Sequence, residues 1–285
     1  MTQVITGLQQ IADRFDHVLL DQYGVLHHGK DVFAEARDCV AALHERGKRI
    51  LVLTNSGKRP EDNLERLAKK GLPAESYDGV LSSGEVAWQG LRDRKAVPFT
   101  QVGRRCFLLS RDGDRGVVDG LDLELVALGA AEFILLAGLD DDQADPGAWT
   151  DRPAGAAARN VLMICANPDI TMFSPQGLLP APGALAQSYE GLGGKVAYIG
   201  KPYRIMFEAA LQALGNPDPR RVLMVGDSLD HDILGGRGAG ILTLLTTSGV
   251  HREALAGSTD LAASIRRLAG SEARMPHWAI DRLVW

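Results

Sequence analysis

The sequence predicts an α/β protein with a Rossmann-like, doubly wound parallel sheet. Short apolar runs of β-forming residues alternate with helix-like segments along most of the chain, a rhythm typical of repeated β–α units. Two of these runs, HVLLDQYG at 17–24 and RVLMVGDS at 221–228, end in an aspartate followed at once by turn-forming residues. The chain has 285 residues, of which 45% are hydrophobic. It is therefore long enough for one large domain or two ordinary ones.

The β–α rhythm is regular on either side of a less regular middle. The expected strands there are His17–Leu20, Arg49–Leu53, Tyr77–Leu81, Lys195–Ile199, Val222–Val225 and Ile241–Leu245. The expected helices are Ala34–Arg46, Pro60–Lys70, a segment capped by Ser82 or Ser83, Gly183–Leu192, Tyr203–Leu214, Asp230–Arg237 and Asp260–Leu268. The chain closes with the apolar WAIDRLVW, which is expected to dock on the core or on a partner.

The middle block, from about Glu85 to Pro180, has the size of a domain. Its expected strands are Cys106–Ser110, Glu132–Ala137 and Asn160–Ala166, and Asp122–Leu128 is expected to be helical. A stretch of low hydrophobicity, DDDQADPGAWTDRPAGAAARN, is expected to form a helix pair or a loop. Because the β–α pattern on either side would make one sheet, the block reads as an insertion. Residues 1–84 and 180–285 are then a discontinuous core domain, and 85–179 a second α/β domain.

Composition argues against several classes of function. The formal net charge is −5 and no run of lysine or arginine stands out, so nucleic acid is not an expected partner. No window approaches the roughly 18 apolar residues of a membrane span, and the N-terminus lacks the pattern of a signal peptide. A cytoplasmic protein with no membrane partner is expected. The isolated Cys39, Cys106 and Cys165 are expected to be buried, reduced thiols.

Aspartates at strand ends are the first candidates for chemistry. Asp21 alone is equally compatible with a nucleophile, a metal ligand or a turn residue. GDSLDHDI adds Asp227, Asp230 and Asp232, and a charged helix start would explain Asp230 well but Asp227 poorly. Open α/β sheets place functional groups outside the carboxyl ends of their strands. Carboxylates crowded there repel one another, so a hard cation is expected among them.

Two further segments offer groups for an anion. Thr54, Asn55 and Ser56 end an apolar run, and their hydroxyls and backbone N–H groups could hold an oxyanion or simply cap a helix. Lys201 follows another run and precedes a helix that begins after Pro202. A lysine there can bind phosphate as a point charge, although an exposed lysine is the commoner situation.

The four motifs in this order resemble the haloacid dehalogenase superfamily of phosphatases and phosphotransferases. They are a strand-end Asp, a strand-end Thr, an isolated Lys and a strand followed by Gly-Asp-x₄-Asp. The details GVL, TNS, GKP and GDSLDHDI, with NPD at 167–169, resemble class IIA, which contains nitrophenyl phosphatase-, nucleotide monophosphatase- and pyridoxal phosphatase-like enzymes. The long block between the Thr and Lys motifs is similar to the inserted C2-type cap of that class.

The resemblance implies an Mg²⁺-dependent hydrolase of small phosphorylated metabolites. Asp21 would attack the phosphoryl group and form an aspartyl-phosphate. Mg²⁺ would lie between Asp21, Asp227 and the backbone carbonyl of Tyr23, supported by Asp232. Phosphoryl oxygens would be held by Thr54, with Asn55 and Ser56, and by Lys201.

Charge and substrate choice follow from the same implied site. A dianionic phosphate and three aspartates carry −5 against +3 from Mg²⁺ and lysine, so phosphate should bind poorly without metal. The cap would select the substrate, with Asn167, Asp169 and the stretch 138–160 as candidates, and a homodimer through the cap is compatible with the family.

Position 23 departs from the family pattern, which has a second aspartate there as general acid and base. Tyrosine is a poor base at neutral pH. Three explanations stay open: substrates with good leaving groups, replacement by His27 or His28, or loss of turnover. The competing hypothesis is therefore a catalytically weak phospholigand-binding or regulatory protein on this scaffold. A dinucleotide enzyme is disfavoured because no G-x-G-x-x-G follows the first strand.

Overall fold

The computed structural model describes residues 2–140, 151–174 and 177–285. The chain forms two compact units, each described here by itself. The core unit comprises Met1–Thr54, Pro60–Leu81 and Lys201–Trp285, and the inserted unit comprises Asn55–Arg59 and Ser82–Gly200. No helix in the described ranges combines the length and the apolar character that crossing a bilayer requires.

The core unit is built on a seven-stranded sheet in the order β1-β14-β13-β12-β2-β3-β4. The strands are β1 (Gln3–Val4), β2 (His17–Leu20), β3 (Arg49–Thr54), β4 (Gly79–Ser82), β12 (Val222–Gly226), β13 (Leu242–Thr246) and β14 (Trp278–Ile280). The six strands from β1 to β3 pair in parallel. β2 lies between β12 and β3, so the strands that carry the predicted motifs are neighbours.

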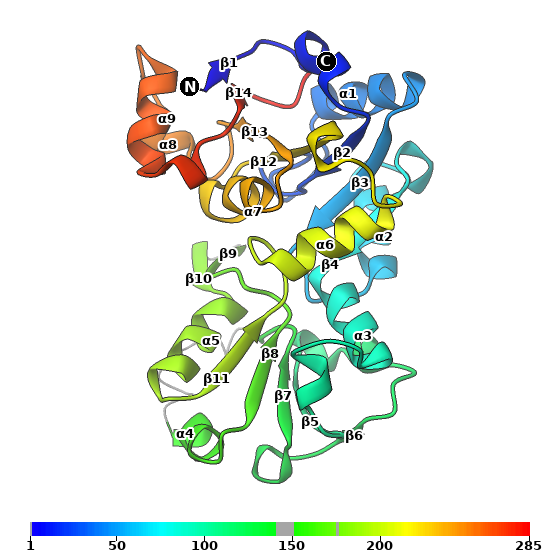
Figure 1. The fold of residues 1–285 in the computed structure, drawn as a ribbon, viewed down its shortest axis with the longest axis vertical. Coiled ribbons are helices and arrows are strands. Elements are labelled where there is room, and N and C mark those ends of the chain that lie inside the picture. Colours follow the sequence, from blue (N-terminus) through cyan, green and yellow to red (C-terminus); the bar gives the residue numbers. More distant parts are fainter. Residues whose placement is uncertain (1, 141–150, 175–176) are drawn as a thin grey trace. The chain divides into compact units, whose positions relative to one another are not determined.

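Helices cover both faces of this sheet, as a doubly wound fold requires. They are α1 (Ala34–Glu45), α2 (Pro60–Lys69), α6 (Arg204–Ala213), α7 (Leu234–Gly238), α8 (Arg252–Leu255) and α9 (Leu261–Ala269). Leu244 of β13 packs in one buried cluster with Val40 of α1, whereas the next residue, Leu245, packs in another with Ile265 of α9. Consecutive strand residues point to opposite faces, and Figure 1 shows α1 and α9 on opposite sides of the sheet.

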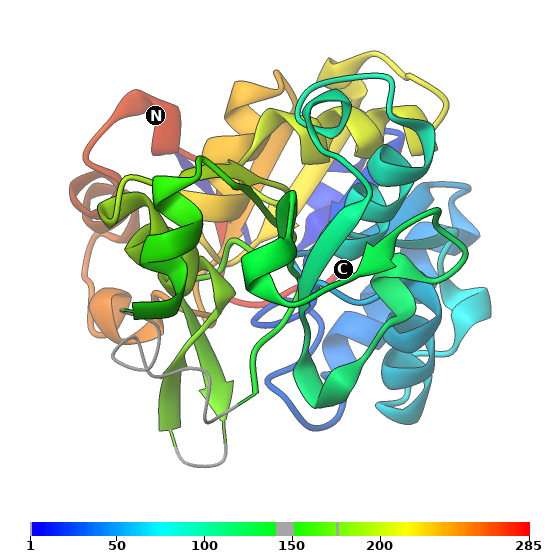
Figure 2. The same cartoon turned by 90° about the horizontal axis from the view of Figure 1, so that it is seen from below.

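The inserted unit contains a five-stranded parallel sheet in the order β11-β8-β7-β5-β6. Its strands are β5 (Arg105–Leu109), β6 (Glu124–Leu125), β7 (Phe133–Leu136), β8 (Leu162–Cys165) and β11 (Lys195–Tyr198). Its helices are α3 (Ser83–Asp93), α4 (Asp151–Ala158) and α5 (Pro182–Gly191). An antiparallel pair, β9 (Thr171–Ser174) with β10 (Gly177–Pro180), stands apart from that sheet (Figure 2).

The insertion reaches further than the predicted 85–179. Gly183–Leu192 and Lys195–Ile199 are predicted to belong to the core, but β11 pairs with β8 from Lys195↔Leu162 to Tyr198↔Cys165. Both elements therefore belong to the inserted unit, as does the short segment 55–59. Hydrophobic periodicity identifies a β–α unit but does not say which sheet it joins.

Two local predictions also need correction, and one alternative is decided. The segment Asp122–Leu128 is not a helix: Glu124–Leu125 pairs as a short strand with Arg105–Cys106, with alternating polar and apolar side chains. Asp230–Arg237 is a π-helical turn over Leu229–Ile233 followed by the short α7. The closing segment docks on the core unit and supplies β14, which lies inside the sheet between β1 and β13.

Candidate active site

Two neighbouring parallel strands bring Asp21 and Asp227 together. β2 and β12 pair in parallel from Val222↔His17 to Val225↔Leu20. The backbone N–H of Asp21 continues this ladder by donating to the carbonyl of Val225 at 3.0 Å. Both aspartates thus leave the sheet at the same edge, as the strand-end motifs predict.

Asp232 completes a cluster of three carboxylates. It lies in the turn after β12, and ligand oxygens of Asp21, Asp227 and Asp232 all lie within 4.8 Å of one another. Asp230, from the same turn, is not part of this cluster, because its carboxylate pairs with Arg274 at 2.9 Å. Of the aspartates in GDSLDHDI, Asp227 and Asp232 therefore belong to the acidic cluster, whereas Asp230 does not.

Lys201 is the cation of this cluster. Its ammonium Nζ lies 2.6 Å from Oδ1 of Asp21 and 2.7 Å from Oδ1 of Asp232. The lysine side chain is only 3% exposed, so it is not the solvated surface lysine of the alternative explanation. The second oxygen of Asp232, Oδ2, accepts the backbone N–H of Ser228 at 3.0 Å.

The electrostatics of the cluster favour an additional positive charge. Burial raises the pKa of Asp21 to about 7, although Lys201 acts against this shift. Burial and the carboxylates of Asp21 and Asp232 raise the pKa of Asp227 well above its usual value. When all three carboxylates are ionised, the single ammonium of Lys201 leaves two negative charges unbalanced. A divalent cation with a preference for oxygen ligands fits both the charge and the donor set.

Two glycines hold the Asp227 carboxylate in place. A Cβ at Gly249 would lie 2.2 Å from Oδ2 of Asp227, and a Cβ at Gly24 would lie 2.0 Å from the same oxygen. The backbone N–H of Val250 donates to this oxygen at 2.9 Å. Sequence reasoning missed these supports. Gly24 in DQYGVL and Gly249 in TTSGVH were the signals from which they could have been found, since glycine is required where the backbone approaches a side chain so closely.

Two residues after Asp21, the side chain of Tyr23 packs on a histidine. The Tyr23 ring meets the His27 ring edge to face, with centroids 6.2 Å apart and an interplanar angle of 87°. Burial and the Asp227 carboxylate raise the pKa of the Tyr23 phenol. Burial, with Lys70 and Arg66, lowers the pKa of His27 to about 4. At neutral pH both side chains are therefore uncharged.

His27 and His28 have different surroundings. His27 is buried, and its Nδ1 accepts the backbone N–H of Gly29 at 3.1 Å. His28 is exposed, and its ring lies against that of Phe33 with centroids 5.0 Å apart. The contacts of both rings are with Gly29, Tyr23 and Phe33.

The TNS motif is divided between the two units. Thr54 is the buried last residue of β3 in the core unit, whereas Asn55 and Ser56 belong to the inserted unit. The carbonyl of Ser56 accepts the backbone N–H of Gly84 at 3.0 Å and the Ser83 hydroxyl at 3.2 Å. The three residues are predicted to form one anion-binding turn, but Asn55 and Ser56 belong to the inserted unit, where Ser56 contacts the start of α3.

Asn55 lies with the NPD residues. Its amide Nδ2 donates to Oδ1 of Asp169 at 2.8 Å. The side-chain oxygen of Asn167 in turn accepts the backbone N–H of Asp169 at 3.1 Å. Three predicted substrate-binding residues are therefore linked within the inserted unit, although Asn55 and Asp169 are 114 positions apart in sequence. Of the candidate stretch 138–160, residues 141–150 lie outside the described residues.

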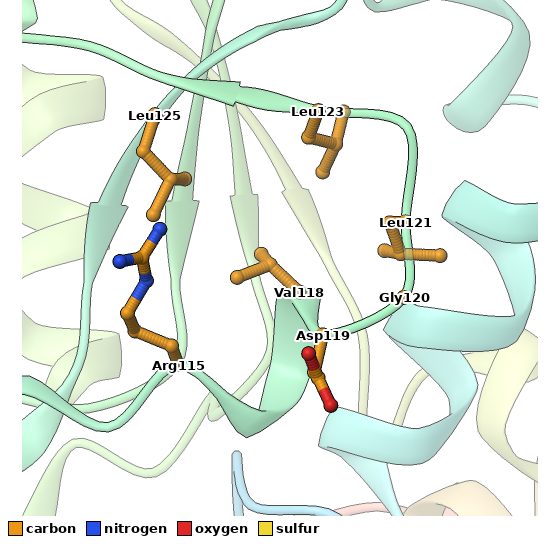
Figure 3. Close-up of a pocket in the computed structure, with 7 residues that line it drawn as sticks. All are labelled: Arg115, Val118, Asp119, Gly120, Leu121, Leu123 and Leu125. Carbon is orange, nitrogen blue, oxygen red and sulfur yellow. The ribbon is translucent and has the colours of Figure 1, made fainter.

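The inserted unit also contains a pocket of about 410 Å³ beside β6. It is lined by Arg115, Val118, Asp119, Gly120, Leu121, Leu123 and Leu125 (Figure 3). None of the residues selected from the sequence lines it. Its lining offers one guanidinium and one carboxylate among aliphatic side chains, and it lacks the cluster of acidic groups described above.

Comparisons with known proteins point in one direction. A model of haloacid dehalogenase-like hydrolases matches residues 18–124, and a HAD-hydrolase-like model matches residues 198–268. Chronophin from Homo sapiens is 31% identical over 258 residues, covering 86% of this chain and 86% of that protein. The 5'-nucleotidase YutF from Bacillus subtilis (strain 168) is 29% identical over 238 residues, covering 81% and 87%. A solved structure of a haloacid dehalogenase-like hydrolase from Brucella suis 1330 is 30% identical, with a TM-score of 0.83 and coverage of 99% and 100%.

Proposed function

The chain belongs to the haloacid dehalogenase-like hydrolase family, and from this premise we propose that it is an Mg²⁺-dependent phosphatase with Asp21 as its nucleophile. The membership that the strand-end motifs predict is confirmed by these relatives. Its substrates are small phosphorylated metabolites. One observation carries the proposal: Asp21, which follows β2, forms one cluster with Asp227 and Asp232, which follow β12, and the buried ammonium of Lys201 contacts Asp21 and Asp232.

Each residue has a role in the proposed reaction. The Asp21 carboxylate attacks the phosphoryl group as the ester P–O bond to the leaving oxygen breaks, which forms an aspartyl-phosphate; water then attacks phosphorus, releases inorganic phosphate and regenerates the carboxylate. Asp21, Asp227 and the backbone carbonyl of Tyr23 would hold Mg²⁺, which supplies positive charge for the phosphoryl oxygens when bound. Lys201 holds a phosphoryl oxygen in exchange for one of its carboxylate contacts. Asp232 supports the site by fixing Lys201 at 2.7 Å.

Thr54 is proposed to bind phosphate from the end of β3. Asn55, Ser56, Asn167 and Asp169 are proposed to bind substrate through the inserted unit, whose polar loops would then select among phosphorylated metabolites. Nucleotides are a reasonable first class of substrate, because YutF is named a 5'-nucleotidase. A cytoplasmic location and a homodimer through the inserted unit remain predictions from the sequence.

Phosphate release from p-nitrophenyl phosphate tests the proposal, with and without Mg²⁺, in wild type, Asp21→Asn and Tyr23→Asp. Asparagine keeps the shape of aspartate but is not a nucleophile, so turnover should need Mg²⁺ and be lost in Asp21→Asn. Turnover that persists in Asp21→Asn would exclude the proposed nucleophile.

A phospholigand-binding protein of low turnover is the second candidate, and Tyr23 is the observation that favours it. General acid–base help is typically worth about 10²–10⁴ in rate. An inert wild type that binds inorganic phosphate only with Mg²⁺, together with an active Tyr23→Asp variant, would support this second function. Both candidates use the same carboxylates and the same lysine.

A further inference from the structure

We propose that the pocket beside β6 is a second ligand site, which binds a small aliphatic monocarboxylate with Arg115 as its counter-ion. This inference goes beyond the proposed function, because the pocket contains no member of the carboxylate cluster and no residue assigned to the phosphorylated substrate. All the residues that line it belong to the inserted unit.

Three leucines form the apolar wall of the pocket. They occupy alternate positions in the segment LDLEL at 121–125, where Asp122 and Glu124 are exposed and the leucines are half-buried. Side chains two residues apart in an extended chain lie on one side, and Figure 3 shows these leucines around the same space as Val118. An aliphatic body placed there would remove leucine surface from water, which is the main source of affinity for an apolar group.

Arg115 supplies a positive charge that no described group neutralises. Among the described residues, the side chain of Arg115 has neither a hydrogen bond nor an ion pair. In Figure 3 its guanidinium is directed toward Leu125, whereas the Asp119 carboxylate points away from the leucines. The other arginines of the inserted unit whose side chains the structure describes each donate to an oxygen: Arg59, Arg92, Arg94, Arg104, Arg105, Arg111 and Arg159.

The charge of the pocket selects a monoanion. One guanidinium can donate two parallel hydrogen bonds to one carboxylate, which adds geometric specificity to the ion pair. A phosphate monoester carries nearly two negative charges at neutral pH. The carboxylates of Asp119, Asp122 and Glu124, on the same loop as Arg115, would repel the additional charge. The pocket therefore suits a monocarboxylate better than the phosphorylated compounds proposed as substrates.

Hydrogen bonds hold the loop that forms the pocket in place. Oδ1 of Asp114 accepts the backbone N–H of Gly116 at 2.8 Å, and Oδ2 pairs with the ammonium of Lys58 at 3.0 Å. The indole N–H of Trp88 donates to the backbone carbonyl of Asp119 at 2.8 Å. A ligand therefore enters a pre-formed site, and the ordering of a mobile loop, which would lower the affinity, is not required.

The volume of the pocket limits the length of the ligand. A volume of about 410 Å³ lies within the range of small-molecule sites, which is about 300–1,000 Å³. At about 30 Å³ for a group the size of a water molecule, the pocket holds about a dozen such groups. Octanoate, a straight-chain carboxylate that is somewhat smaller than this limit, is therefore a suitable probe.

Titration of the full chain with octanoate, followed by NMR of leucine and valine methyl groups, tests the inference. We expect the methyl resonances of Val118, Leu121, Leu123 and Leu125 to shift, with a Kd of about 1 mM or lower. Arg115→Met keeps an apolar side chain but removes the charge, so it should bind octanoate at least about tenfold more weakly. Octanol, which has the same chain without the carboxylate, should bind both proteins equally.

Arg204→Met in the core unit is the matched control. Arg204 is also an exposed arginine, and it pairs with Glu208 instead of lining the pocket. Its variant should bind octanoate as wild type does. All titrations are made in EDTA and without a phosphorylated substrate, so their outcome is independent of the proposed metal site and of turnover.

Three results would overturn the inference. Equal affinity of wild type and Arg115→Met for octanoate would show that the guanidinium is not part of the site. Tighter binding of octyl phosphate than of octanoate, with shifts of the same methyl resonances, would show that the pocket prefers a phosphate ester. An absence of shifts in folded wild type at about ten times the expected Kd would show that the pocket does not bind a carboxylate, whether or not Arg115→Met folds. Each of these results leaves the proposed phosphatase activity untouched.

Discussion

A methyl group added at Gly249 should displace the Asp227 carboxylate and weaken the proposed metal site. The Cβ of Gly249→Ala would lie 2.2 Å from Oδ2 of Asp227 and 2.3 Å from its Cβ. These separations are more than 1 Å shorter than an ordinary contact, which is about 3.5–4.0 Å between carbon atoms. Gly249 does not have a positive φ, so alanine is tolerated by the backbone itself and the whole effect is steric.

The structure sets the size of the effect. Overpacking of this kind costs about 1–3 kcal/mol in the free energy of unfolding without metal. Relief requires Asp227 to move by about 1 Å, which would also break its 2.9 Å contact with the N–H of Val250. Loss of a contact that orients a metal-ligating side chain typically lowers metal affinity about 10- to 100-fold. At a free cation concentration of 100 times the wild-type Kd, wild type gains about 2.7 kcal/mol. A variant with 100-fold weaker binding gains about 0.4 kcal/mol.

Urea unfolding of wild type and Gly249→Ala, in EDTA and in saturating Mg²⁺, separates the cost of overpacking from the loss of metal affinity. Gly47→Ala is the matched control: Gly47 has a φ of +67° but nothing within 4 Å of its added Cβ. It should lose about 1–2 kcal/mol from backbone strain alone and keep the full response to Mg²⁺. Gly24→Ala combines both penalties, because Gly24 has a φ of +77° and meets the same Asp227 oxygen. It should therefore lose the most stability.

Two outcomes would refute this reasoning. A Gly249→Ala protein that gains as much stability from Mg²⁺ as wild type would show that Asp227 is not held where the cation binds. An equal loss of the Mg²⁺ response in Gly47→Ala would show that any strained glycine in the core unit has the same effect. A wild type without any response to Mg²⁺ would remove the cation from the proposed site.

Three further predictions concern stability. Lys201→Met leaves two buried carboxylates without their ammonium and should lower the free energy of unfolding in EDTA by about 3–5 kcal/mol; a loss below about 1 kcal/mol would contradict the pairing. Asn55→Ala removes the donor to Asp169 and should cost about 1–2 kcal/mol by urea unfolding, and an unchanged midpoint would argue against that contact. Burial and Arg237 lower the pKa of His277 to about 4. The neutral imidazole therefore stabilises the folded state above pH 6.5, and this stabilisation is lost as pH falls toward 4. Unfolding from pH 7 to 5 should show about 2 kcal/mol of this loss in wild type but not in His277→Gln, and equal pH dependence in both proteins would refute it.

The sequence predicts the core site well because its geometry is set by adjacent strands. Asp21 and Asp227 each follow an apolar run directly, and parallel pairing of β2 with β12 brings their ends together. Local hydrophobicity is enough to predict that these runs are buried strands. The residue that follows each strand is then placed close to the carboxyl end of the sheet. The same logic explains why Thr54, at the end of β3, is the one member of TNS that stays with the core sheet.

The inserted unit is less predictable because its contacts are distant in sequence. Asn55 and Asp169 are joined by a hydrogen bond across 114 positions, and nothing near either residue indicates its partner. Strand β11 is a similar case, since its composition suits either sheet and only its pairing with β8 decides. The short strand β14 also went unrecognised, because three residues of an apolar tail give too little periodicity.

Tyr23 shows where a motif stops being informative and a structure is needed. The sequence identifies a missing carboxylate and two histidines that could replace it. Replacement by a histidine, substrates with good leaving groups and loss of turnover are equally compatible with the sequence alone. The hydrogen bond from the N–H of Gly29 to Nδ1 of His27 bears on one of these explanations, because in a neutral ring it leaves the proton on Nε2. A good leaving group would remove the need for an acid in the first half of the proposed reaction, whereas attack by water in the second half still needs a base.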